Sequence, residues 1–163
     1  MFEEKTKKET SGIVVWDNKY NTGIELIDSQ HKQLIELTNE LFLACREKDD
    51  VLQAVFKNAM SRMVEYVRFH FDAEIRFLTA LKYPDLQNHR KKHDLLVENI
   101  LEAAIEYNEG RKYVPNNFTR TLRDWILSHI GFYDKAYTLY VREQIRTGKL
   151  TEEKFREIEL SFK

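Results

Sequence analysis

The spacing of histidine and carboxylate residues constrains this chain more than any other feature of its sequence. Two pairs, His70 with Glu74 and His89 with His93, have members four residues apart. Residues four apart share one face of an α-helix, so each pair points in a single direction. The full set of candidate metal ligands is His31, His70, Glu74, His89, His93, His129 and Asp134. Because this set includes every histidine of the chain, we expect all of them to serve one site.

The pair formed by His129 and Asp134 departs from this spacing. Its members are five residues apart, which is about 140° around a regular α-helix. Either a carboxylate that reaches sideways or a local widening of the helix would bring them together. Such widenings tend to occur at functional sites.

The apolar residues recur at helical spacing, and no alternating strand pattern of useful length is present. We expect long helices over about residues 28–48, 49–81, 85–110 and 115–147, and a shorter one over 151–162. Helices of this length with short connections predict an all-α protein, an antiparallel up-down-up-down four-helix bundle. The histidines fall one or two to a long helix, as a site between four helices requires.

Polar and turn-forming residues mark the ends of these helices. Asp28 or Ser29 can cap the first helix, and Pro84 stops the second. Gly110 is suited to close the third helix and Gly148 the fourth.

The segments outside the helices suggest the division of the chain. We expect residues 1–12 to form a flexible tail and residues 13–148 to form the bundle, with residues 13–27 as an N-terminal arm or lid. Residues 149–163 are expected to form a C-terminal extension that contains the short extra helix.

Charge and composition restrict the partners. The net charge of −1 predicts neither nucleic acid nor an anionic membrane as a partner. No apolar run approaches the roughly 20 residues of a spanning helix, and the lone Cys45 cannot form an internal disulfide. We expect a cytoplasmic monomer without membrane insertion; the sequence indicates no particular protein partner.

The candidate ligands supply enough donor atoms for two metal ions. Five imidazoles offer five nitrogens and two bidentate carboxylates offer four oxygens. If both carboxylates and one solvent oxygen bridge the ions, about eleven of the twelve positions of two octahedra are filled. The open position would admit a small ligand. Imidazole with bridging carboxylate favours non-haem iron, whereas a structural zinc site is normally closed and four-coordinate.

Apolar residues follow or precede the candidate ligands by about one turn or less. As well as belonging to the core, they are expected to wall a pocket for a ligand of the metal ions. These residues are Leu34, Phe71, Trp125, Ile126 and Ile130.

These motifs, with the residues around them, resemble those of the hemerythrin family, and most closely its single-domain bacterial type. The resemblance runs from about Val15 to Thr147. Its motifs are Trp16-Asp17, Tyr20, Gly23-Ile24, Ile27-Asp28, Gln30-His31-Lys32-Gln33-Leu34, His70-Phe71 with Glu74, Tyr83-Pro84, His89 with His93, Trp125, and His129-Ile130 with Asp134.

The resemblance implies an unequal division of the ligands between two iron ions (Fe²⁺/Fe³⁺) bridged by an oxo or hydroxo group. His89, His93 and His129 would fill one iron, and His31 and His70 would leave the other five-coordinate. Glu74 and Asp134 would be the bridging carboxylates. The implied function is reversible, non-enzymatic binding of O₂ for storage, transport or delivery.

Two other function classes stay open at this point. A di-iron oxidase, peroxidase or nitric-oxide-handling protein could use the same fold, although the Glu-x-x-His pairs of ferritin-like di-iron enzymes do not occur here. An oxygen or redox sensor would have to act through a separate partner, because the chain has no recognisable signalling domain.

Overall fold

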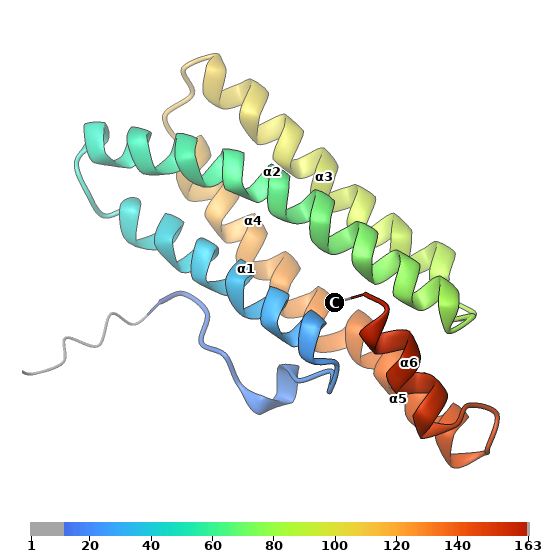
Figure 1. Ribbon diagram of the computed structural model, residues 1–163. Helices are drawn as coiled ribbons and strands as arrows, with labels where there is room; N and C mark the ends of the chain where they lie inside the picture. The colour runs from blue at the N-terminus through green and yellow to red at the C-terminus, as the bar shows by residue number, and fades with distance from the viewer. Residues whose placement is uncertain (1–11, 163) are drawn as a thin grey trace, which may run out of the picture.

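Four helical segments pack side by side (Figure 1). Their apolar stripes are buried between them. The structure is a computed structural model that describes residues 12–162. The first three segments are α1 (Glu25–Ala44), α2 (Asp49–Ala80) and α3 (Leu86–Asn108). They and the fourth segment form a closed ring, since α1 contacts α2, α2 contacts α3, α3 contacts α4 and α4 contacts α1. The predicted all-α four-helix bundle is confirmed, and the described part of the chain contains no strand.

The fourth segment is continuous but not regular. It consists of α4 (Val114–Ser128), the π-helical turn η2 (His129–Asp134) and α5 (Lys135–Arg146). The predicted single helix is therefore interrupted by a widened turn, which begins and ends at the two residues whose spacing was irregular.

The predicted start of the first helix was wrong by about one turn. The helix α1 begins at Glu25, and Asp28 lies inside it without capping its amides. The Asp28 carboxylate instead accepts hydrogen bonds from the backbone N–H groups of Thr22 (2.7 Å) and Gly23 (3.1 Å). Its short polar side chain therefore fixes the approach of the chain to α1.

The segments outside the bundle pack against it. Asn39 of α1 holds the arm by accepting from the Val14 N–H (3.0 Å) and donating to the Val14 carbonyl (2.8 Å). At the other end of the chain, α6 (Glu152–Leu160) corresponds to the predicted extra helix, and the ring of Phe155 meets that of Phe77 in α2. The predicted tail lies outside the described residues except for Gly12.

The core is divided into two apolar clusters. On α1, Ile27 belongs to one cluster and Leu34 to the other. On α2, Phe71 and Phe77 are divided in the same way. His31 lies between Ile27 and Leu34, Glu74 lies between Phe71 and Phe77, and His70 lies between Val67 and Phe77. The candidate ligands of α1 and α2 therefore form a polar layer between the two apolar clusters.

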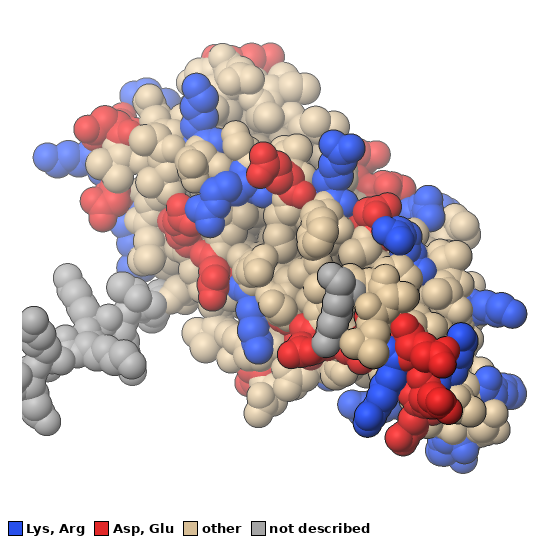
Figure 2. All heavy atoms as spheres, viewed as in Figure 1, with Lys and Arg blue, Asp and Glu red and all other residues tan. Residues whose placement is uncertain are grey.

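The surface carries both signs of charge. Basic and acidic side chains are interspersed over the face shown in Figure 2, with no continuous basic area. No helix in the described part of the chain is long and apolar enough to cross a membrane.

Candidate metal centre

The bundle brings all seven predicted ligands to one level of its interior. None of their side chains is more than about 3% exposed. Each of the four helical segments contributes one or two of them: His31 from α1, His70 and Glu74 from α2, His89 and His93 from α3, and His129 and Asp134 from η2.

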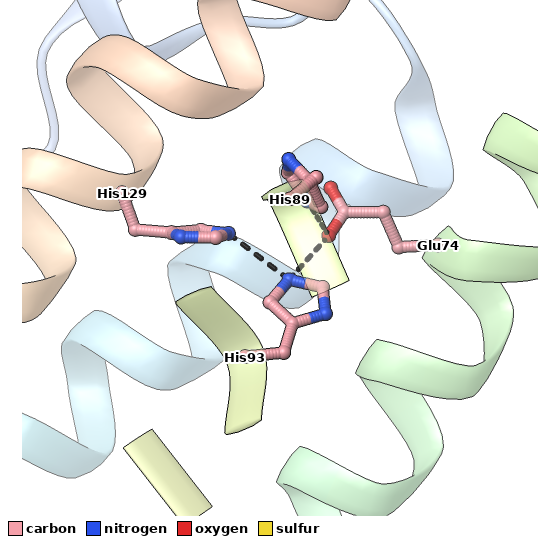
Figure 3. Close-up of side chains that lie close together, drawn as sticks. All are labelled: Glu74, His89, His93 and His129. Carbon is pink, nitrogen blue, oxygen red and sulfur yellow. Dashed lines mark hydrogen bonds and ion pairs between the residues drawn. The ribbon is translucent and has the colours of Figure 1, made fainter. Parts of the chain in front are cut away.

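Three histidines and one carboxylate converge in the first of two groups (Figure 3). The Nε2 atoms of His89 and His93 lie 3.1 and 3.0 Å from Glu74 Oε2. His93 Nε2 is also 3.0 Å from His129 Nε2. Three imidazoles from two different helical segments thus direct the same ring atom toward one point.

The second group contains two histidines and shares the same carboxylate. The ligand atoms of His31, His70 and Glu74 all lie within 4.8 Å of one another. His70 Nε2 is 3.9 Å from Glu74 Oε2, and the rings of His31 and His70 meet edge to face at 5.1 Å. Glu74 is therefore common to both groups.

Asp134 connects the two groups through its separate oxygens. Its Oδ1 lies 3.1 Å from His129 Nε2, and its Oδ2 lies 3.1 Å from His31 Nε2. A carboxylate that faces a different histidine group with each oxygen is placed as a bridge between two metal positions.

The π-helical turn explains how Asp134 reaches this place. In a π-helix the hydrogen bond joins residues five apart, and such single turns are frequent at functional sites. The turn spans His129–Asp134, so these two residues come onto the same face. Of the two solutions that the sequence allowed, local widening of the helix is the one observed.

The donor atoms fit octahedral metal ions. Donors at right angles around an ion about 2.1 Å away lie about 3.0 Å from one another. His93 Nε2 lies 3.0 Å from Glu74 Oε2 and 3.0 Å from His129 Nε2. Moreover, His31 Nε2 and both carboxylate oxygens of Asp134 are buried and, although His31 and His129 lie 3.1 Å from this carboxylate, these atoms form no well-directed hydrogen bond among the described residues. Buried polar atoms left without partners are expensive, so these residues suit cations that would occupy the space between them.

Three residues that the sequence analysis missed orient the ligands. Gln30 Oε1 lies 2.7 Å from His70 Nδ1. Because a carbonyl oxygen only accepts, Nδ1 carries the proton, and Nε2 keeps a lone pair for a metal. Tyr66 stacks on the His70 ring and donates its hydroxyl proton to the Gln30 backbone carbonyl. The buried Tyr137 hydroxyl donates to Glu74 Oε1 at 2.8 Å.

Helical spacing offered a signal for two of these residues. Tyr66 precedes His70 by four positions, and Tyr137 follows Asp134 by three, so each shares a face with a ligand. Gln30 precedes His31 directly, and only the packing of α1 on α2 aims it at His70 rather than at its neighbour.

The protonation states favour metal binding at two of the ligands. Burial lowers the pKa of His70 to about 3, so its imidazole stays neutral. Burial and the Glu74 charge oppose ionisation of Asp134, but contacts with His129 and His31 outweigh them and hold its pKa below the usual range. A neutral imidazole and an ionised carboxylate are the forms that coordinate metals.

Aromatic rings cover the three-histidine group. Phe71 stacks on His93 with ring centroids 3.6 Å apart, and Trp125 stacks on His129 at 4.2 Å. The other predicted lining residues, Leu34, Ile126 and Ile130, are at most 1% exposed and belong to the same apolar cluster. Tyr133, which directly precedes Asp134, is half-buried with its ring beside His129.

Comparison with known proteins agrees with this arrangement. Residues 22–138 match the family model described as the hemerythrin HHE cation binding domain. Bacteriohemerythrin of Stenotrophomonas maltophilia is 26% identical over 133 residues, which cover 82% of this chain and 84% of that protein. Bacteriohemerythrin of Pseudomonas aeruginosa is 29% identical over 132 residues, which cover 81% of this chain and 84% of that protein.

A solved structure shares the fold. The crystal structure of a leucine-to-phenylalanine mutant matches with a TM-score of 0.71 and 25% sequence identity, covering 78% of this chain and 96% of that chain. All seven candidate ligands lie within the segment that the family model matches.

Proposed function

This chain belongs to the hemerythrin family, and on that premise we propose that it binds dioxygen reversibly at a non-haem di-iron centre. The role is non-enzymatic storage, transport or delivery of oxygen. The observation that carries the proposal is the pair of unequal ligand groups, one with three histidines and one with two, that share Glu74.

The proposed ligands divide as the two groups do. His89, His93 and His129 hold one iron ion, and His31 and His70 hold the other. The carboxylates of Glu74 and Asp134, each of which lies near both histidine groups, would hold both ions. Two iron ions held there supply the electrons that reversible binding of dioxygen requires. The group with two histidines offers one nitrogen ligand fewer and would leave room there for a small ligand.

The surrounding residues protect the centre from water and stray protons. Exclusion of water limits side reactions of bound ligands. We assign this role to the apolar residues predicted to line the site: Leu34, Phe71, Trp125, Ile126 and Ile130. Support comes from their burial and from the two ring stacks on His93 and His129.

The test is an absorption spectrum of the reduced, iron-loaded protein before oxygen, after oxygen and after removal of oxygen. We expect a ligand-to-iron charge-transfer band that appears with oxygen and disappears on deoxygenation. Direct conversion to a stable diferric protein, with no reversible band, would instead favour a di-iron oxidase, a peroxidase or a redox sensor.

The apolar wall can be tested with two substitutions on one helix. Leu34→Ala will keep the iron but speed oxidation of the oxygenated protein to the diferric form by roughly tenfold, equivalent to about 1.4 kcal/mol of barrier. Leu41→Ala is the matched control, because Leu41 is equally buried in the same cluster but lies about 10 Å farther along α1. The measurement is the decay of the oxygen-dependent band in air. Equal decay rates in the two variants would remove Leu34 from the wall.

A further inference from the structure

A hollow that plays no part in the metal centre lies between α1 and α4, beside the segment that leads to Val14. Its volume is about 470 Å³. Three arginines line it, Arg46 from the turn after α1 and Arg120 and Arg123 from α4, and none of its lining residues is acidic. Three positive charges around one hollow attract an anion.

Two of these guanidinium groups have no carboxylate partner in the described part of the chain. Arg123 is paired with Asp124, with its Nε 2.7 Å from Oδ1. Arg46 instead lies over the ring of Phe42, with its guanidinium carbon 4.5 Å from the ring centroid. No ion pair within residues 12–162 involves Arg120. The hollow thus retains about two positive charges after the pairing of Arg123.

The remaining lining residues suit a ligand with both polar and apolar parts. The amide of Asn116 can donate or accept hydrogen bonds, and Ile13 and Phe42 offer apolar contact. Guanidinium groups bind phosphate through paired N–H···O bonds. A phosphate monoester carries about −1.5 to −2 charge near neutral pH, which matches the residual charge of the hollow. The volume leaves room for an organic group beside the phosphate.

We propose that the hollow between α1 and α4 binds a small phosphate monoester through Arg46, Arg120 and Arg123. The site is separate from the metal centre, since Cys45 at the hollow follows His31 by fourteen residues, about 20 Å along α1. Its existence therefore does not depend on whether the metal centre binds oxygen.

The test uses phenyl phosphate as the probe and the full iron-loaded chain. Isothermal titration calorimetry should show saturable binding that is weakened at least about tenfold by Arg120→Gln and by Arg46→Gln. Arg142→Gln is the matched control, because Arg142 is an exposed arginine of α5 outside the hollow. The affinity of this variant for phenyl phosphate should stay within about twofold of that of the unmodified chain. Arg120→Lys should give intermediate affinity, because lysine keeps the charge but loses the planar fork.

The single thiol supplies an independent readout. Cys45 lines the hollow and is half-buried. Saturating phenyl phosphate should slow its alkylation by neutral iodoacetamide at least about threefold. Absence of binding to the unmodified chain would overturn the proposal, as would equal weakening by Arg142→Gln or unchanged alkylation of Cys45. Retained circular dichroism shows that each variant is folded.

Discussion

Replacement of Glu74 by alanine will reduce the iron content of the purified protein from about two ions per chain to fewer than about one. Glu74 is common to both ligand groups, and its Oε2 lies within 3.1 Å of two histidine nitrogens. Its loss would remove an anionic ligand from both ions at once and leave the five histidines with only one carboxylate, Asp134. Metal analysis of the protein, reconstituted anaerobically with ferrous iron, provides the measurement.

The control for this prediction lies on the same helix. Glu65→Ala removes an exposed carboxylate of α2 and should leave the iron content unchanged. Glu74→Gln keeps the shape of the side chain and separates loss of charge from loss of packing. If Glu74→Ala is folded and retains two ions with normal oxygen binding, the assignment of Glu74 as a bridging ligand is wrong.

Removal of iron will lower the stability of the protein substantially. Seven ionisable side chains are buried in one layer, and bound metal ions would compensate their lost solvation and the repulsion between the carboxylates of Glu74 and Asp134. A ligand present at about a thousand times its dissociation constant stabilises the folded state by about 4 kcal/mol. For a chain of this size that corresponds to a difference of roughly 8–16 °C in melting temperature. Calorimetry of the loaded and chelator-treated protein tests this, and equal melting temperatures would contradict it.

The metal-free protein will in addition be most stable at about pH 6.5. The pKa of His70 falls from 6.5 to about 3 on folding. Between these values the unfolded chain binds a proton that the folded chain does not, so acidification costs up to about 1.4 kcal/mol per pH unit. The lowered pKa values of Glu74 and Asp134 add to this loss below about pH 4.

Above about pH 6.5 the stability of the metal-free protein falls because of histidines whose pKa values are raised on folding. Burial would lower the pKa values of His31 and His89, but the carboxylates of Asp134 and Glu74 beside them raise both. Their contribution to stability is present below pH 6.5 and is lost as the pH rises through the raised values. Urea denaturation of the metal-free protein from about pH 4 to pH 8 should give a maximum; a stability that rises or falls steadily over this range would refute the interpretation.

The bundle itself was predictable because helices leave strong periodic signals. The ends of α2 and α3 fall within about two residues of their predicted positions. The start of α1 was less predictable, because an aspartate near a helix end can accept hydrogen bonds from backbone amides in the first turn of the helix or from backbone amides in the segment before it. Asp28 does the latter, and only the path of the arm decides between the two.

The spacing within the helices nominated the pairs His70 with Glu74 and His89 with His93, and the use of every histidine together with the family resemblance completed the set of seven. Side chains four apart must share a helical face, whatever surrounds the helix. The relative positions of ligands from different helices have no such local cause. Glu74 belongs to both groups, and Asp134 turns one oxygen toward each, because of the way α1, α2, α3 and η2 pack.

The tertiary structure also decided features for which the chain carries only weak local signals. The irregular spacing of His129 and Asp134 allowed two solutions, and the widened turn η2 is the one that the packed helix adopts. The hydrogen bonds from His70 to Gln30 and from Tyr137 to Glu74 join residues 40 and 63 positions apart. Local spacing determines which side chains face inward, because it depends only on helix geometry. Which of them then meet depends on contacts between distant segments, and these exist only once the bundle has closed.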